Sequence, residues 1–179
     1  KGKGTATVAP IRKISFIRKI AKNIKSHPRD YALFIFGIHS GLRGSDILNL
    51  KFRDILKDGK VKKVIRLTEQ KTKKNIEFAL SLKPRKALAA LLPEESELLG
   101  MASLVFPGRN GKPMSIQRLH QLVCQWCEDA GLDENYGTHT LRKTWAYHML
   151  RQGTRIDLVM EMLGHSAMSI TLKYAGITR

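Results

Sequence analysis

The chain has 179 residues, 42% of them hydrophobic, which is enough for the core of one domain and excludes a chain that is disordered throughout. Lysine and arginine number 32 against 15 aspartate and glutamate residues, so the formal net charge is +17. The positive charge runs along the whole chain. It therefore favours a polyanionic partner, with nucleic acid preferred over an anionic membrane surface.

Targeting signals are not visible in the sequence. No apolar run approaches the roughly 20 residues that a membrane-spanning helix needs. The first residues, Lys1 to Gly4, carry neither an apolar stretch nor a signal-peptide cleavage site. We therefore expect a protein without membrane contact, located in the cytoplasm and associated with the nucleoid when it binds DNA.

The first part of the chain is predicted to be helical. Residues 1–9 are expected to be a flexible leader, after which Pro10 begins an amphipathic helix with its isoleucines on one stripe. The first helix is expected to end at His27-Pro28, before the next helix begins. The elements predicted to follow are a buried helix from Arg29 to Ile38, a turn at residues 41–44, and a short helix capped by Ser45 that runs to Leu50.

The hydrophobic period then changes from helical to alternating. Asp58-Gly59 is a tight-turn signal, and residues 61–67 and 76–80 are typical of strands. The basic residues 70–75 lie between these strands as a hairpin tip. We expect a small antiparallel sheet of about three strands.

The rest of the chain is predicted to be mostly helical, with a loop at residues 106–113. Ser115, Thr138 and Thr154 are the expected helix caps. The predicted helices cover residues 84–92, 115–131, 138–152, 154–163 and 167–175. The fold class is therefore α+β, mainly α, with residues 10–179 forming one compact domain of helices and a small antiparallel three-stranded β-sheet.

Cys124 and Cys127 form a Cys-x-x-Cys pair, for which a zinc or redox role is one interpretation. The pair lies inside a helical pattern of apolar residues, so packing in the core as reduced thiols is the preferred interpretation. No cluster of His, Cys, Asp and Glu has metal-ligand spacing. We therefore expect no metal and no cofactor.

Several basic residues have the chemistry that phosphodiester cleavage needs. The negative charge on the phosphate must be offset, a nucleophile must attack in line, and the leaving alkoxide must be protonated. Arg43 and Arg142 are candidate phosphate clamps, because a guanidinium meets two phosphate oxygens at once and stays protonated. His139 lies three residues before Arg142, so the two share a face if the segment is helical. A solvated surface charge is the alternative for either arginine alone.

Tyr174 is the candidate nucleophile, nine residues after His165, and an ordinary half-buried aromatic is the alternative. Its reference pKa of about 10 means that it must lose its proton during attack or have its pKa lowered by nearby positive charge. His165 could bind the phosphate or take part in proton transfer. Lys71 could be a general acid, a phosphate anchor or a solvated charge, and Lys73 and Lys74 compete for the same role.

The combination and order of these residues resemble the catalytic domain of the tyrosine recombinases, the phage integrase family, over residues 10–175. The segment from Ser40 to Leu50 is similar to the first arginine box of that family, and residues 69–73 resemble its lysine hairpin. Residues 138–146 resemble its HxxR box. Residues 163–166, together with Tyr174, resemble its histidine and nucleophile boxes. All six expected positions hold the family's own residue types.

The resemblance implies how the phosphate is attacked and held. Tyr174 would attack the scissile phosphate to give a 3′-phosphotyrosyl link and a free 5′-hydroxyl. Arg43, Arg142 and His165 would hold the phosphate and stabilise the transition state.

The resemblance also implies how protons move. Lys71 would be the general acid, His139 would assist proton transfer, and Asp46 would support the site beside Arg43. The lysines expected to contact DNA are Lys73, Lys74 and Lys143.

The implied function is that of the catalytic domain of a site-specific recombinase or integrase, which cuts and rejoins double-stranded DNA at recombination sites. The covalent link keeps the bond energy, so no ATP, metal or small-molecule substrate is expected. Members act as tetramers on two duplexes, which implies a homo-tetramer on DNA, with a monomer as the alternative for free protein. Nothing here corresponds to the family's N-terminal DNA-binding domain, so we expect part of a longer protein.

Two other functions compete with this one. A type IB topoisomerase has the same chemistry but does not require paired sites. A non-catalytic basic DNA-binding protein would use the basic helices and hairpin only to hold the DNA backbone. Substitution of Tyr174 distinguishes the last alternative, because a binding protein would keep its activity.

Overall fold

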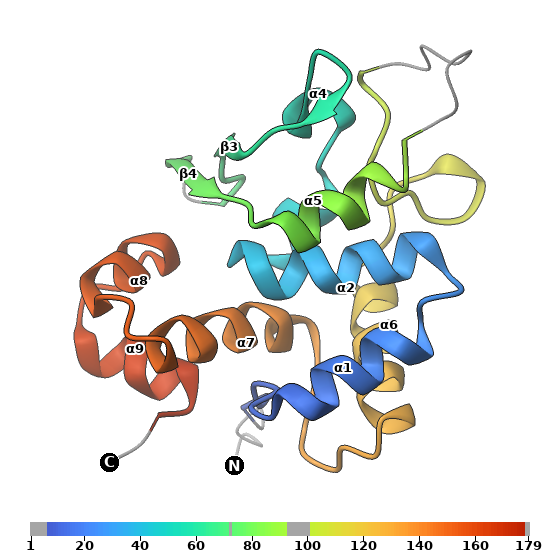
Figure 1. Ribbon diagram of the computed structural model, residues 1–179. Helices are drawn as coiled ribbons and strands as arrows, with labels where there is room; N and C mark the ends of the chain where they lie inside the picture. The colour runs from blue at the N-terminus through green and yellow to red at the C-terminus, as the bar shows by residue number, and fades with distance from the viewer. Residues whose placement is uncertain (1–6, 72, 93–100, 178–179) are drawn as a thin grey trace, which may run out of the picture.

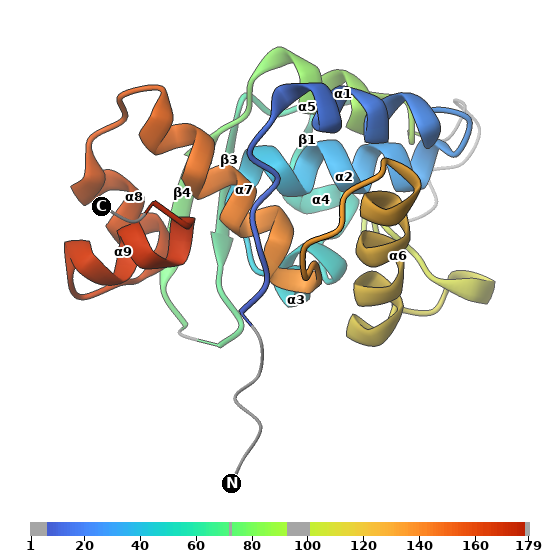
Figure 2. The ribbon, with the colours of Figure 1, turned by 90° about the horizontal axis from the view of Figure 1, so that it is seen from below.

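The computed structural model describes residues 7–71, 73–92 and 101–177, in which helices predominate (Figure 1). The expected α+β, mainly α class is confirmed. Most elements surround one large buried core. The last two helices, α8 (Ile156–Leu163) and α9 (Met168–Ala175), pack together beside the C-terminal part of α7 (Thr138–Arg151), as Figures 1 and 2 show.

The first helix begins later than the sequence pattern predicts. α1 spans Ile14–Asn23, and residues 7–13 before it are not helical. A helix from Pro10 is wrong because this backbone bonds to other elements. The Ile11 N–H donates to the Thr144 hydroxyl at 2.9 Å, and the Ile11 carbonyl is hydrogen-bonded to the His148 ring at 2.9 Å. Of the expected leader, residues 1–6 lie outside the described residues, whereas Ala9 is buried.

The central helix of the core is α2 (Pro28–Ser40), which packs against α1, α5 (Leu82–Ala89) and α7. Its residues 32–38 are all buried, because their continuous apolar run leaves no polar face for solvent. Gly41, with a φ of 66°, ends the helix in the left-handed conformation. A Cβ at Gly41 would lie 2.7 Å from a ring carbon of Trp145, so both the turn and the packing require glycine.

Two short helices, α3 (Gly44–Leu48) and α4 (Phe52–Ile55), follow α2. The sequence predicts Ser45 as the cap of α3, and this prediction is wrong. The helix begins before it, with Arg43 extended at the cap position and without a side-chain cap. A Cβ at Gly44 would lie 2.6 Å from the Thr138 methyl group, so close packing against the start of α7 fixes where α3 begins.

The first β-ribbon joins β1 (Leu56–Lys57) to β2 (Lys60–Val61). The tight turn predicted at Asp58-Gly59 is confirmed, with φ of 50° and 71° at these two residues. Positive φ at both central residues matches the twist of an antiparallel hairpin.

The second ribbon joins β3 (Val64–Thr68) to β4 (Asn75–Ala79) in an antiparallel pair. The expected three-stranded sheet is wrong, because the described strands form two separate two-stranded sheets. The Lys62 N–H donates to the Ile55 carbonyl at 2.8 Å, which extends the β1–β2 pairing by one residue pair before β3 begins.

The later helices lie close to their predicted positions. α5 begins at Leu82, before the predicted start at Pro84. A single 3-10 turn, η1 (Arg109–Gly111), lies in the predicted loop. Ser115 caps α6 (Ile116–Asp129) by accepting a hydrogen bond from the Arg118 N–H at 3.1 Å, as predicted.

Glycines shape the ends of the C-terminal helices. The caps of α7 and α8 are Gly137 and Arg155, and the predicted caps Thr138 and Thr154 are wrong. The Thr140 hydroxyl instead accepts from the Gly137 N–H at 3.0 Å, which starts α7 one residue early. Left-handed glycines, Gly164 and Gly176, end α8 and α9.

A small second core joins the C-terminal helices to α7. Ala146, Val159, Leu163 and Ala175 are buried together, with Tyr174 packed against them. This core holds α9 against α7, and it therefore fixes Tyr174 beside the helix that bears the His-x-x-Arg residues.

Cys127 packs in the core as expected, and burial raises the pKa of its thiol to about 12. Cys124 donates to the Tyr136 carbonyl at 3.2 Å, and neither cysteine is in a disulfide. Across residues 7–71, 73–92 and 101–177, no group of three or more His, Cys, Asp or Glu residues could hold a metal ion. No helix in these ranges has the length and apolar character to cross a membrane.

Candidate active site

Arg43 and Arg142 come together from different parts of the fold. Arg43 follows the Gly41 turn and its side chain is partly exposed, whereas the Arg142 side chain projects from the first half of α7 and is buried. Arg142 Nη2 donates to the carbonyls of Met162 at 3.3 Å and Leu163 at 3.0 Å, at the end of α8. These bonds fix the direction of the Arg142 guanidinium. Its burial lowers its pKa, because desolvation disfavours the charged form, and the two carbonyl acceptors offset part of that cost.

Glu69 is a site residue that the sequence analysis did not identify. It is 4% exposed at the end of β3, and its Oε1 is paired with the guanidinium of Arg43. The same oxygen lies 3.6 Å from Arg142 Nη1. A carboxylate between two guanidiniums offsets their mutual repulsion and orients both. Its only sequence signal is its place in the lysine hairpin, because the pairing joins residues that lie far apart in the chain.

Asp46 connects α3 to the tip of the second ribbon. Its Oδ1 accepts a hydrogen bond from the Gln70 N–H at 3.0 Å, and the side chain is buried. This bond ties the segment that bears Arg43 to the segment that bears Lys71. Asp46 therefore lies where a supporting role beside Arg43 is expected.

The two histidines flank the Tyr174 side chain. His139 Nδ1 lies 3.4 Å from the Tyr174 hydroxyl, within hydrogen-bonding distance. The His165 ring meets the Tyr174 ring edge to face, with 5.1 Å between centroids, and its Nδ1 is hydrogen-bonded to the Thr171 hydroxyl at 3.0 Å. Burial, and then the nearby cations led by Arg142, lower the pKa of both histidines. Both imidazoles are therefore favoured in the neutral form.

Tyr174 projects from α9 into this group and is only partly exposed. Burial raises the pKa of its hydroxyl, and the charges of Arg142 and Arg43 lower it by less. The phenol therefore carries its proton at neutral pH in the DNA-free protein. A base must take that proton when the hydroxyl acts as a nucleophile, and His139 is within reach.

The hairpin lysines differ from Lys143. Lys71, Lys73 and Lys74 are exposed at the tip of the β3–β4 ribbon, and the charge of Lys71 contributes to lowering the pKa of His139. Lys143 is only 4% exposed, and its amine donates to the Val8 carbonyl at 2.9 Å. Its amine is therefore covered by the protein in this structure, and a contact between Lys143 and DNA stays a prediction.

Comparison with known proteins gives the family. The chain matches the model of the phage integrase family over residues 13–179. The chain belongs to the phage integrase family. The probable integrase/recombinase YoeC of Bacillus subtilis (strain 168) is 36% identical to it over 173 residues, which make up 95% of this chain and 90% of YoeC. The tyrosine recombinase XerC of Neisseria meningitidis serogroup B (strain ATCC BAA-335 / MC58) is 33% identical over 146 residues. That match covers 82% of this chain but only 47% of XerC, so the chain spans about half the length of this relative.

Solved structures of the family share the fold. The crystal structure of XerA recombinase has a TM-score of 0.75 at 18% identity, covering 97% of this chain and 60% of XerA. XerH site-specific recombinase, in a post-cleavage complex with palindromic difH substrate, has a TM-score of 0.70 at 23% identity. That match covers 97% of this chain and 50% of XerH. The chain therefore shares the fold of these recombinases.

The catalytic residues predicted for this member of the phage integrase family lie close together in the structure. Arg43, Arg142, His139, His165 and Tyr174 lie together where α3, α7 and the α8–α9 pair meet. Lys71 lies at the edge of this group, on the ribbon tip. The arrangement combines two guanidiniums, two neutral imidazoles and a phenol, which is chemistry suited to a bound phosphodiester.

Proposed function

We propose that the chain is the catalytic part of a site-specific DNA recombinase that cuts and rejoins DNA through Tyr174. The observation that carries this proposal is the position of the Tyr174 hydroxyl, 3.4 Å from His139 Nδ1 and within the electrostatic reach of Arg142 and Arg43. An isolated surface tyrosine would have neither a base within reach nor two guanidiniums acting on it. Family membership supports the same reaction class.

In the proposed cleavage step, the Tyr174 oxygen forms a bond to the scissile phosphorus and the bond from phosphorus to the 5′ oxygen breaks. The phenol proton passes to His139, whose lowered pKa keeps its ring neutral and able to accept it. The 5′ oxygen takes a proton from Lys71. The products are a 3′-phosphotyrosyl link and a free 5′-hydroxyl, and the reverse step rejoins the strand.

The basic residues of the site stabilise the negative charge that develops on the phosphate. Arg43 and Arg142 bind the non-bridging oxygens, and His165 adds a hydrogen bond from the α8–α9 turn. Two bidentate donors held in a partly buried site can stabilise developing negative charge strongly. In the DNA-free protein Glu69 pairs with both arginines, so a bound phosphate shares guanidiniums that a carboxylate has already oriented. Asp46 holds the ribbon in place beside them.

The proposed partner is double-stranded DNA, and the active form on DNA is a homo-tetramer. The net charge of +17 supports binding to a polyanion, and the exposed Lys73 and Lys74 on the ribbon are the proposed contacts to the DNA backbone. Two solved relatives with the same fold support a DNA substrate, because XerH is described on its difH site in pre-cleavage and post-cleavage complexes and lambda integrase on a COC′ core site. Rejoining needs no ATP or metal in this proposal, because the phosphotyrosyl bond conserves the energy and the arginines supply the charge.

A nicked suicide substrate tests the reaction. The protein is incubated in EDTA with nicked duplexes that carry candidate recombination sites, and the products are separated on a denaturing gel. We expect a slow-migrating protein–DNA adduct that is absent for Tyr174→Phe. Tyr147→Phe is the matched control, because Tyr147 lies on α7 but is not part of the site, and it should still form the adduct. Binding without any adduct, for this chain and for a longer form that contains it, would contradict the proposal.

A further inference from the structure

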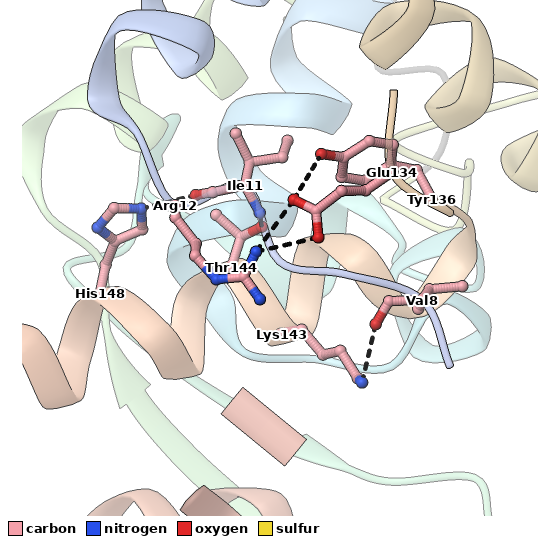
Figure 3. A network of polar contacts seen from close by, with 8 residues as sticks. All are labelled: Val8, Ile11, Arg12, Glu134, Tyr136, Lys143, Thr144 and His148. Atoms are coloured by element: carbon pink, nitrogen blue, oxygen red, sulfur yellow. Dashed lines mark hydrogen bonds and ion pairs between the residues drawn. The ribbon is translucent and has the colours of Figure 1, made fainter. Parts of the chain in front are cut away.

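Residues 8–12, which the proposed reaction does not use, run along one face of α7 (Figures 2 and 3). The Lys143 amine donates to the Val8 carbonyl, the Ile11 N–H donates to the Thr144 hydroxyl, and His148 is hydrogen-bonded to the Ile11 carbonyl, each at 2.9 Å. All three side chains belong to the helix that bears His139 and Arg142. We name residues 8–12 the N-terminal strap.

The strap is also tied to the loop that precedes α7. The Arg12 guanidinium donates to the Glu134 carboxylate at 3.0 and 3.1 Å, and the Tyr136 hydroxyl donates to the same carboxylate at 3.4 Å (Figure 3). The Ala9 N–H donates to the Asn135 carbonyl at 2.7 Å. Polar contacts on both sides therefore fix the path of a segment that has no secondary structure of its own.

The strap is connected to α9, the helix that bears Tyr174, in two ways: through Lys143 of α7 and directly at Gly176. The Lys143 amine that holds Val8 also lies 5.1 Å from the centroid of the Tyr174 ring, in a cation–π contact. At the end of α9, a Cβ on Gly176 would lie 3.0 Å from Arg12 Nη2 and 3.3 Å from Pro10 Cγ. One contact is to the ring of Tyr174, and the other is to the turn two residues after it.

Lys143 is unusual because a lysine is seldom buried unless its charge is satisfied. Its 4% exposure leaves no route for a phosphate while the strap is in place. Its two described partners, the Val8 carbonyl and the Tyr174 ring, account for the burial. They make Lys143 a bridge between the strap and the nucleophile.

We propose that Lys143 and the N-terminal strap position Tyr174, holding its ring beside His139 and Arg142. Lys143 acts here as a positioning residue, since it touches the Tyr174 ring and no reacting atom. Loss of the strap contact would release the ammonium and loosen the Gly176 turn, so fewer molecules would carry Tyr174 in place. The effect on cleavage rests on the proposed function, whereas the effect on α9 does not.

Two measurements on the 179-residue chain test this inference. Amide hydrogen exchange reports the order of residues 168–177 without DNA, and suicide-substrate cleavage at saturating DNA reports the chemical step. We expect Lys143→Met to speed exchange in this segment and to slow cleavage, each by about ten-fold, as loss of a desolvated cation–π contact predicts. The affinity for DNA should not change. Arg12→Ala, at an exposed strap position, should act in the same direction.

Lys86→Met is the matched control, because Lys86 is an exposed lysine on α5 and should change neither readout. Unchanged exchange in residues 168–177 for both Lys143→Met and Arg12→Ala would overturn the inference. Weaker DNA binding by Lys143→Met without faster exchange would also overturn it, because Lys143 would then be a DNA contact. If neither the unmodified chain nor a longer form that contains it forms an adduct, the proposed function fails, and the exchange result still tests whether the strap positions Tyr174.

Discussion

Glu69 pairs with both Arg43 and Arg142 while it is almost fully buried, so it carries much of the electrostatic balance of the site. Removing one member of a buried ion pair leaves the other charge uncompensated. Arg142 keeps its two carbonyl acceptors and Arg43 is partly exposed, so both retain some compensation. The cost should therefore lie below that of a fully buried pair.

We predict that Glu69→Gln lowers the free energy of unfolding by about 2 kcal/mol in urea denaturation. Glu77→Gln is the matched control, because Glu77 pairs with Arg66 on the exposed face of the same ribbon, and it should change stability by less than about 0.5 kcal/mol. Equal effects of the two substitutions would show that the Glu69 pairing does not organise the site.

The proposed role of Lys71 as general acid can be tested by substitution of this residue alone. We predict that Lys71→Ala slows cleavage by roughly 10²- to 10³-fold, as loss of a general acid does. Replacing the 5′ bridging oxygen of the substrate by sulfur should restore the rate, because a thiolate leaves without a proton.

Lys73→Ala and Lys74→Ala are the controls for Lys71, since both lysines lie on the same ribbon tip. They should weaken DNA binding and show no selective rescue by sulfur. Rescue of either variant in place of Lys71→Ala would assign the general acid to that lysine.

At the level of elements, the glycine that ends α2 places Arg43. Gly41 has a φ of 66°, and a Cβ there would lie 2.7 Å from the Trp145 ring. We predict that Gly41→Ala lowers the free energy of unfolding by about 3 kcal/mol, combining left-handed strain with overpacking. Gly153→Ala, with a φ of 87° and no atom near its Cβ, should cost only about 1 kcal/mol. Similar losses in thermal or urea unfolding would contradict a packing role for Gly41.

Local signals in the sequence were sufficient to predict most helices and to select the candidate residues of the site. The Ser115 cap and the Asp58-Gly59 turn each depend on neighbours in sequence, and both were predicted correctly. The extended strap was missed because its hydrogen bonds reach residues more than a hundred positions away, at Thr144 and His148.

Dependence on contacts between residues far apart in sequence also explains the other differences between the predicted and the observed structure. The separation into two ribbons was missed because an alternating pattern predicts strands but does not show which strands pair. Glu69 was not singled out in the sequence, and Lys143 was expected to contact DNA. Their burial depends on contacts between distant parts of the chain, from Glu69 to the two arginines and from Lys143 to the strap, which only the assembled fold reveals.

For the whole molecule, three histidines link stability to pH. Burial is the largest cause that lowers the pKa of His39, His139 and His165, and neighbouring cations add to it. The unfolded chain then binds more protons than the folded chain near and below the ordinary histidine pKa of about 6.5. Their contribution to stability is therefore present above that pH and is lost as the pH falls towards the lowered folded values.

We predict that the free energy of unfolding decreases as the pH falls from about 7 to about 5, measured by urea denaturation at each pH. The His139→Gln, His165→Gln double variant should show a shallower decrease, because two of the three linked groups are gone. A stability that is constant over this range, or that rises on acidification, would contradict the lowered pKa values.

Tyr174 is proposed to form a covalent bond to DNA, and mass spectrometry of the trapped adduct identifies the bonded residue. Lys173 precedes Tyr174, so trypsin should release a peptide that begins at Tyr174. After nuclease digestion, we predict that this peptide carries a nucleotide joined through its 3′ phosphate to the tyrosine oxygen. A nucleotide found on another residue, or an adduct that persists in Tyr174→Phe, would contradict the account.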